Sequence, residues 1–181
     1  MAQKQTDYAS AIARKFPEQV VIALAKDAKG IPNPITLGWT MIVSGTPPMM
    51  AIAVAKGHYS VGAIRHSKEF VIAFPAEDMG EEVLFYGTHS GRDTEKLKAH
   101  PCALQQASGV DGVLLADAVA NFECTLASEL ETGDHIVFVG EVVAAHVNPE
   151  PKQRLYTVGP GYKMSGVRPT GGPRRSREQH K

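Results

Sequence analysis

The sequence predicts a mainly β protein, an antiparallel barrel or sandwich with short flanking helices. Apolar, β-branched runs separated by turn residues give about six or seven strands, and most of them form local hairpins. The regular strand–helix alternation that indicates a parallel sheet is absent. The 181 residues suit one domain, since single domains commonly have about 100–200 residues.

The first half of the chain contains four predicted strands. A short helical lead-in over Ala9 to Phe16 ends at Pro17. The strands are expected over residues 19–25, 35–43, 49–55 and 69–74, with a short helix over residues 60–66. Pro32 and Pro34 lack backbone donors, so strand pairing is expected to begin only after them.

The second half begins with helical patterns and ends with the strongest hairpin after the first one. Met79 to Tyr86 has helical spacing, with acidic residues at its start, where the helix dipole favours them. A polar loop, Gly87 to Asp93, precedes a short charged helix that ends at Ala99. Strands over residues 118–130 and 135–147 flank the turn Gly133-Asp134.

We expect three segments: a lead-in over residues 1–18, one domain over residues 19–164, and a disordered basic tail over residues 165–181. The tail is rich in Gly, Pro and Arg, and it fits a solvated segment better than a contact with an acidic partner or nucleic acid. The formal net charge of +0 argues against a surface built for nucleic acid.

Cysteine use and hydropathy predict a cytoplasmic protein. Cys102 and Cys124 are far apart and have no metal-ligand spacing, which indicates a reducing compartment, and Cys124 is expected to be a buried, inert thiol. The polar N-terminus lacks the apolar segment of a secretory signal, and no apolar stretch approaches the roughly 20 residues that cross a bilayer.

Metal and covalent catalysis are not indicated by the sequence. The histidines are scattered without metal-ligand spacing, and no nucleophile elbow or phosphate-binding glycine loop is present. We therefore expect no metal site, and we expect a cofactor to carry any chemistry.

Residues 33–60 could hold a flavin mononucleotide (FMN). FMN needs donors and a cation for its phosphate, and an apolar slot with small residues for its ring. The candidates are Thr36, Thr40 and Ser60 as hydroxyls, Lys56 as a cation, and Gly38 and Ala53 as small residues. Taken alone, this stretch fits a core hairpin better, since Thr and Trp are good strand formers.

Two later stretches are further candidates. Ser90 to Lys96 combines a hydroxyl, a glycine turn and two cations that could hold an anion, although, taken alone, it fits a solvated loop with a helix cap better. Gly133-Asp134-His135, with Gly140-Glu141-Val142, taken alone indicates a turn with a structural histidine.

Together, four signatures in this order resemble the flavin reductase-like, FMN-binding split-barrel family, and its flavoredoxin branch in particular. The resemblance extends from about Val20 to Ala145. The signatures are Asn33-x-x-Thr36-x-x-Trp39 before Ser44-x-x-Pro47-Pro48, then Tyr59-Ser60, then Ser90-Gly91-Arg92-Asp93-x-x-Lys96, and finally Gly133-Asp134-His135-x-x-x-x-Gly140-Glu141-Val142.

The resemblance implies a six-stranded antiparallel Greek-key split barrel that works as a homodimer, with FMN on each subunit near the dimer interface. It implies that Asn33 to Thr40, including Ile35, Gly38 and Trp39, line the edge of the isoalloxazine ring. The expected phosphate neighbours are Lys56, His58, Tyr59 and Ser60, and the loop residues expected at the cofactor are Ser90, Arg92 and Lys96. His135 is the one catalytic candidate, as a neighbour of the ring or of a nicotinamide, and no proton-donor role is assigned to it.

Two positions depart from the family pattern. Ala73 replaces an Asn that the family usually has, which predicts the loss of one polar flavin contact. His58 stands where the family often has Thr or Ser, so phosphate binding there is expected to depend on pH, because histidine titrates near neutrality.

Three functions remain open from the sequence. The favoured one is an FMN-dependent reductase that takes hydride from NADH or NADPH. The second is a flavoredoxin-type carrier that keeps its FMN and exchanges electrons with a protein partner. The third is a binding module on the same barrel without a cofactor.

Overall fold

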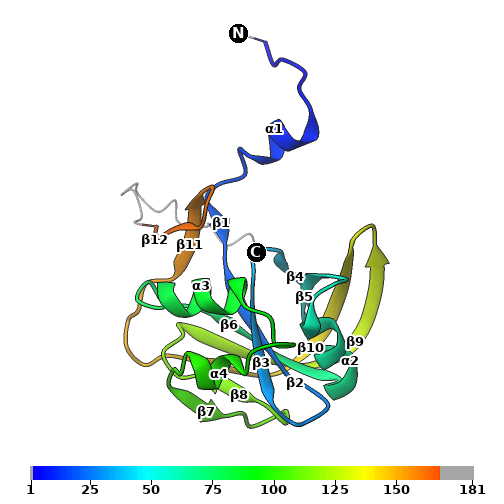
Figure 1. The fold of residues 1–181 in the computed structure, drawn as a ribbon, viewed down its shortest axis with the longest axis vertical. Coiled ribbons are helices and arrows are strands. Elements are labelled where there is room, and N and C mark those ends of the chain that lie inside the picture. The colour runs from blue at the N-terminus through cyan, green and yellow to red at the C-terminus, as the bar shows by residue number, and fades with distance from the viewer. Residues whose placement is uncertain (1, 168–181) are drawn as a thin grey trace, which may run out of the picture.

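The computed structural model describes residues 2–167, and it shows a mainly β protein built on one seven-stranded antiparallel sheet (Figure 1). This confirms the predicted class, a mainly β protein with few short helices. The strands, in their order across the sheet, are β3 (Pro32–Leu37), β2 (Val21–Lys26), β6 (Glu69–Phe74), β9 (Ala120–Thr132), β10 (His135–Val147), β5 (Pro48–Ala55) and β4 (Thr40–Gly45).

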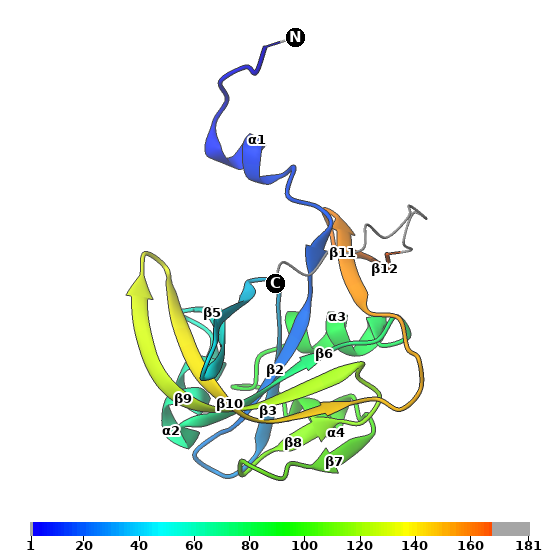
Figure 2. The ribbon, with the colours of Figure 1, turned by 180° about the vertical axis from the view of Figure 1, so that it is seen from behind.

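Smaller elements surround this sheet (Figure 2). Two small sheets combine β1 (Glu18–Gln19), β11 (Leu155–Gly159) and β12 (Lys163–Gly166), and β7 (Leu104–Gln106) with β8 (Val113–Leu115). The helices are α1 (Tyr8–Ile12), α2 (Tyr59–Ser67), α3 (Gly80–Thr88) and α4 (Lys96–Ala99). Helix α1 buries none of its residues and projects away from the body.

The predicted tail falls mostly outside the described residues. Ser165 and Gly166, where we expected the tail to begin, are the last two residues of β12, and residues 168–181 are not described. Within residues 2–167, every helix is too short or too polar to cross a bilayer.

The strand predicted over residues 35–43 is in fact two strands, β3 and β4, separated by Gly38 and Trp39. These two strands form opposite edges of the sheet although only two residues separate them. The sheet must therefore curl until its edges approach each other at this corner. Gly38 makes the corner tight, because a Cβ there would lie 3.1 Å from the Glu18 carboxyl carbon.

The prediction that pairing begins after Pro34 was wrong. Pro32 lies opposite Lys26 in the ladder, and Pro34 lies opposite Leu24. Both prolines are tolerated because β3 is an edge strand, where a missing N–H need not remove a ladder hydrogen bond.

Two cores form on the two faces of the sheet. One lies inside the curl and includes Val21, Ile52, Phe70 and Phe138, together with Cys124, which is 0% exposed, as predicted. The strands approach closely there, since a Cβ on Gly140 would lie 2.6 Å from the Phe70 ring. The other core packs β2 and β6 against α3 and the segment before β9.

A buried carboxylate anchors the loop before β8. Glu123 on β9 is 0% exposed and accepts hydrogen bonds from the backbone N–H of Ser108 (2.9 Å) and of Val110 (3.0 Å). His146 Nε2 lies 2.6 Å from the same carboxylate. Burial alone would raise the pKa of Glu123, but these hydrogen bonds outweigh it and lower the pKa to about 2.

We predict that Glu123→Gln destabilises the fold by about 2 kcal/mol at neutral pH, because the amide cannot replace several hydrogen bonds to a charged acceptor. Folding lowers the pKa of Glu123 from 4.5 to about 2, so the carboxylate stabilises the fold fully at pH values above its unfolded pKa. This stabilisation is lost as the pH falls toward the folded pKa. The difference between wild type and variant should therefore shrink in acid.

Urea unfolding at about pH 7 and about pH 3 measures this difference. Glu141→Gln, at an exposed position on β10, is the matched control, and it should leave the free energy of unfolding unchanged at both pH values. An equal loss of stability for Glu123→Gln at both pH values would contradict the assignment.

Candidate functional site

The main cleft lies where β3, the start of α2 and the segment after α3 meet, and its volume is about 250 Å³. It brings together seven residues that the sequence analysis named: Ile35, His58, Tyr59, Ser60, Ser90, Arg92 and Lys96. Gly57 and residues 86–89 complete its lining. Two signatures more than 20 residues apart in the sequence therefore share one cleft.

Lys96 is the central charge of the main cleft. Its Nζ donates to the carbonyl oxygen of Pro34 (2.7 Å) and to that of Tyr86 (2.8 Å), and the residue is only 4% exposed. Burial lowers its pKa to about 8. An ammonium has three N–H donors, and its two partners in the described part of the chain are neutral carbonyls. The arrangement suits an anionic ligand, whose charge would compensate the buried cation.

Asn33 supports the cleft from behind. Its Nδ2 donates to Ser60 Oγ (2.8 Å), so it orients the hydroxyl at the start of α2. Its Oδ1 is buried and has no hydrogen-bond partner within residues 2–167. Gly91 packs against this side chain and against Tyr59, and a Cβ at Gly91 would overlap both. The glycine therefore allows the loop to lie close to the cleft wall.

His58 and Tyr59 occupy different environments. His58 is the N-cap of α2, and partial burial followed by the positive charges of Lys96 and His135 lowers its pKa below 6.5. It is therefore largely neutral at neutral pH. The Tyr59 hydroxyl points toward the β2–β3 turn, where it donates to Asp27 Oδ2 (2.8 Å).

The residues that were predicted to contact the flavin ring, at the corner between β3 and β4, lie outside the main cleft. Trp39, Thr40 and Ala53 line a separate apolar pocket of about 190 Å³. Trp39 is 46% exposed and packs on His135 with ring centroids 4.5 Å apart. The charge of His135 also helps to lower the pKa of His58 in the main cleft.

The remaining predicted residues make contacts within the protein fold. Thr36 Oγ1 donates to the Val83 carbonyl (2.6 Å) and so ties β3 to α3, while Thr40 Oγ1 donates to the Ala51 carbonyl (3.0 Å). Lys56 points away from the main cleft and pairs with Glu131 at 3.1 Å. Ala73 is fully buried in the core against α3, so an Asn there would face that core rather than the main cleft.

Sequence reasoning missed the end of α3. Gly87, Thr88 and His89 line the main cleft, and the His89 ring stacks on Phe85 with centroids 4.0 Å apart. The sequence marked this stretch only as the start of a polar loop, because nothing in its pattern shows which side faces the cleft.

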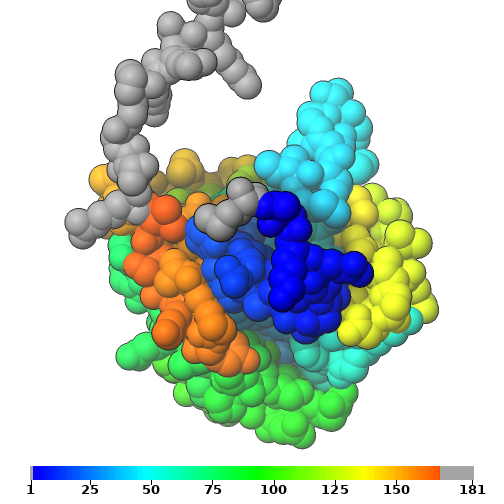
Figure 3. Space-filling view, turned by 90° about the horizontal axis from the view of Figure 1, so that it is seen from above, coloured from blue at the N-terminus to red at the C-terminus, as the bar shows by residue number. Residues whose placement is uncertain are grey.

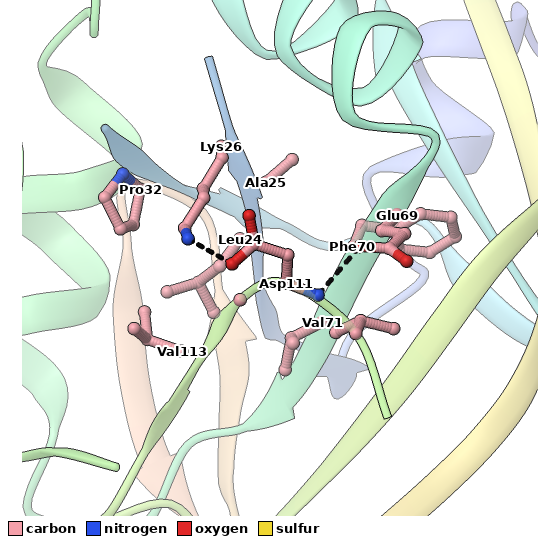
Figure 4. Close-up of a pocket in the computed structure, with 11 residues that line it drawn as sticks. Leu24, Ala25, Lys26, Pro32, Glu69, Phe70, Val71, Asp111 and Val113 are labelled. Atoms are coloured by element: carbon pink, nitrogen blue, oxygen red, sulfur yellow. Dashed lines mark hydrogen bonds and ion pairs between the residues drawn. The ribbon is translucent and has the colours of Figure 1, made fainter. Parts of the chain in front are cut away.

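A much smaller pocket beside β2 and β6 is structural. Its volume of about 10 Å³ holds at most one water molecule (Figure 4). The Asp111 side chain accepts a hydrogen bond from Lys26, and the Asp111 N–H donates to Glu69 Oε2 (2.8 Å). Across residues 2–167, no three His, Cys, Asp or Glu residues are grouped to hold a metal ion.

Comparisons with known proteins identify the family of the chain. A family model described as the flavin reductase like domain matches residues 13–164. A flavin reductase (NADH) from Kitasatospora aureofaciens is 26% identical over 156 residues, which cover 78% of this chain and 72% of that protein. An uncharacterised protein of Archaeoglobus fulgidus is 32% identical over 112 residues, which cover 62% of this chain and 63% of that protein, less than two thirds of its length.

The fold is also found in solved structures. The crystal structure of flavoredoxin from Methanosarcina acetivorans superposes with a TM-score of 0.84 at 22% identity, covering 98% of this chain and 97% of that one. The family model covers most of the chain, and the cleft that gathers the separate signatures lies within its bounds. The chain belongs to the flavin reductase-like family.

Proposed function

We propose that this protein binds FMN in the main cleft and passes electrons from NADH or NADPH through it. The observation that carries the proposal is Lys96, a buried cation whose partners in the described chain are neutral carbonyls. Arg92, from the loop between α3 and α4, and the Ser60 hydroxyl, at the start of the nine-residue helix α2, line the same cleft. A cation, a hydroxyl and a helix N-terminus together are the donors that a phosphate requires.

The residues present fit the rest of FMN. Ile35 in the main cleft and the pocket of Trp39, Thr40 and Ala53 offer apolar surface for the ring, and His135 packs on Trp39. FMN, when bound, supplies the capacity to accept a hydride and release electrons singly or in pairs. The chain's own residues bind and orient it, exclude water from one ring face, and hold positive charge nearby, which favours a ligand that gains negative charge.

Electron transfer to a protein partner, as in a flavoredoxin, is the second candidate function. It is favoured by the similarity to flavoredoxin over nearly the whole chain, whereas the similarity to a flavin reductase (NADH) favours the first. Trp39 gives the second candidate an exposed aromatic contact beside the proposed ring site.

The decisive test mixes the purified protein with FMN and with NADH or NADPH under anaerobic conditions. We expect flavin absorbance to bleach at a rate far above that of free FMN. Bound FMN that survives gel filtration but turns over negligibly with either nucleotide would favour the carrier. A colourless protein that does not bind added FMN would contradict both and favour a cofactor-free module.

Lys96→Met should weaken FMN binding by about tenfold to a hundredfold, corresponding to the loss of one charge-assisted contact of about 1.5–3 kcal/mol. In the wild type, FMN affinity should fall as pH rises through about 8, because the ammonium loses its proton. Calorimetric titration across that pH range measures both effects. Lys98→Met, on the exposed side of α4, is the control. If FMN affinity depended on pH in the same way for the wild type and for Lys96→Met, this would contradict the role of Lys96 in binding the anion.

We also propose a homodimer, in which each subunit is the six-stranded Greek-key split barrel that the resemblance implies. An apolar groove of about 460 Å³ is lined by residues of β4, β5, β6, β9 and β10, including Ile42, Met49, Phe122 and Val142. Ile42 is 77% exposed and Met41 57% exposed on β4. The β4–β5 hairpin projects from the body (cyan in Figure 3). Exposed apolar surface of this extent is typical of a subunit contact.

Ile42→Lys should therefore convert the dimer to a monomer, since a charge buried at such a contact has no partner. Sedimentation velocity at several protein concentrations measures the change. Leu84→Lys, an exposed apolar residue on α3, should leave the association state unaltered. A wild-type protein that is monomeric throughout would refute the dimer.

A further inference from the structure

The turn between β2 and β3 is built around one carboxylate. Asp27 Oδ1 accepts hydrogen bonds from the N–H groups of Lys29 (2.8 Å) and Ile31 (3.0 Å). The backbone adds two more, from the Asp27 N–H to the Ile31 carbonyl (3.0 Å) and from the Gly30 N–H to the Asp27 carbonyl (2.9 Å). Asp27 is only 7% exposed. These contacts fix the direction of its side chain within the turn.

The second oxygen of the Asp27 carboxylate binds outside the turn. Its Oδ2 accepts a hydrogen bond from the hydroxyl of Tyr59 (2.8 Å), the first residue of α2. Burial alone would raise the pKa of Asp27, but the hydrogen bonds from Ile31, Tyr59 and Lys29 outweigh it and lower the pKa. The acceptor is therefore a charged carboxylate at neutral pH, and hydrogen bonds to charged acceptors are the stronger kind. This bond holds the hydroxyl end of the Tyr59 side chain.

The Tyr59 ring supports the loop that carries Arg92. A Cβ at Gly91 would lie 2.7 Å from Tyr59 Cδ1, so the Gly91 backbone lies directly against the ring. Arg92 is the next residue, and its side chain lines the main cleft. The position of this cation therefore depends on the direction of the Tyr59 ring, which in turn depends on Asp27.

The neighbouring side chain at the start of α2 is held by the same part of the fold. Asn33, at the start of β3, donates from Nδ2 to Ser60 Oγ (2.8 Å). Tyr59 and Ser60 are thus both bonded to the segment that begins with the β2–β3 turn. Asp27 lies outside the lining of the main cleft, so any effect of its carboxylate on a ligand there must act through Tyr59.

We propose that Asp27 is a positioning residue for the anion site formed by Ser60, Arg92 and Lys96 in the main cleft. Its carboxylate holds Tyr59, and the Tyr59 ring holds the loop so that the Arg92 guanidinium meets the phosphate of the ligand. This inference rests on the proposed flavin function and concerns how the same site is assembled.

The test compares FMN with riboflavin, which has the same ring system and ribityl chain but no phosphate. Affinities for the full-length protein are measured by the quenching of flavin fluorescence. Tyr59→Phe removes only the hydroxyl and keeps the ring. It should lower FMN affinity by about tenfold, the order of one weakened charge-assisted contact, and leave riboflavin affinity unchanged.

Asp27→Asn tests the other partner of the hydrogen bond. It keeps an oxygen acceptor for the turn but removes the charge, so it should lower the ratio of FMN affinity to riboflavin affinity in the same direction. The double variant should lose no more than the larger single loss, because both changes break one hydrogen bond. Additive losses would show that the Tyr59 hydroxyl contacts the ligand directly and would overturn the role of Asp27.

Asp111→Asn is the matched control. The Asp111 carboxylate accepts a hydrogen bond from Lys26, the residue before Asp27, and it lies outside the main cleft (Figure 4). The same Asp-to-Asn change there should leave the affinity ratio at its wild-type value.

The outcomes separate this inference from the function on which it rests. An unchanged ratio in both Tyr59→Phe and Asp27→Asn overturns the positioning role, even where FMN still binds. Equal losses of FMN and riboflavin affinity would show that the bond only stabilises the fold, and they would also overturn the proposal. Binding of neither flavin to the wild type refutes the flavin function itself.

Discussion

The contacts of Lys96 with two backbone carbonyls hold the functional end of this protein together. One ammonium joins Pro34 on β3 and Tyr86 on α3 from its own position at the start of α4. A buried charge among neutral partners is costly, and hydrogen bonds to carbonyls recover only part of that cost. An anionic ligand would offset the remaining cost of burying the charge. The contact that joins three segments therefore also makes the main cleft favourable for a negative charge.

The curled sheet determines where that cleft can lie. The corner at Gly38 and Trp39 moves the chain from one edge strand to the other, which brings β3 near the start of α2. Close approaches at Gly91 and Gly140 depend on the missing side chain, because the neighbouring atoms occupy the space that a Cβ would need. These two glycines of the signatures thus act through packing.

Stability and function depend on two different buried charges. Glu123 and its backbone donors fix the loop before β8, and this buried carboxylate stays charged because hydrogen bonds compensate its burial. Within residues 2–167, Lys96 in the main cleft donates to two carbonyls and has no carboxylate partner. One buried charge is satisfied by the fold itself, whereas the other is left for a ligand, and this difference distinguishes a structural site from a binding site.

The sequence by itself determined the fold class and the β9–β10 hairpin, because strand periodicity and turn residues are local properties. Ser60, Arg92 and Lys96, which the family resemblance implied to lie at the cofactor, line one cleft. Only the tertiary structure decided that Lys56 pairs with Glu131, that Thr36 binds the Val83 carbonyl, and that residues 35–43 divide into two strands. The direction in which a side chain points depends on residues far away in the chain. The main cleft is formed by three segments that are distant in the sequence: β3, the start of α2 and the segment after α3.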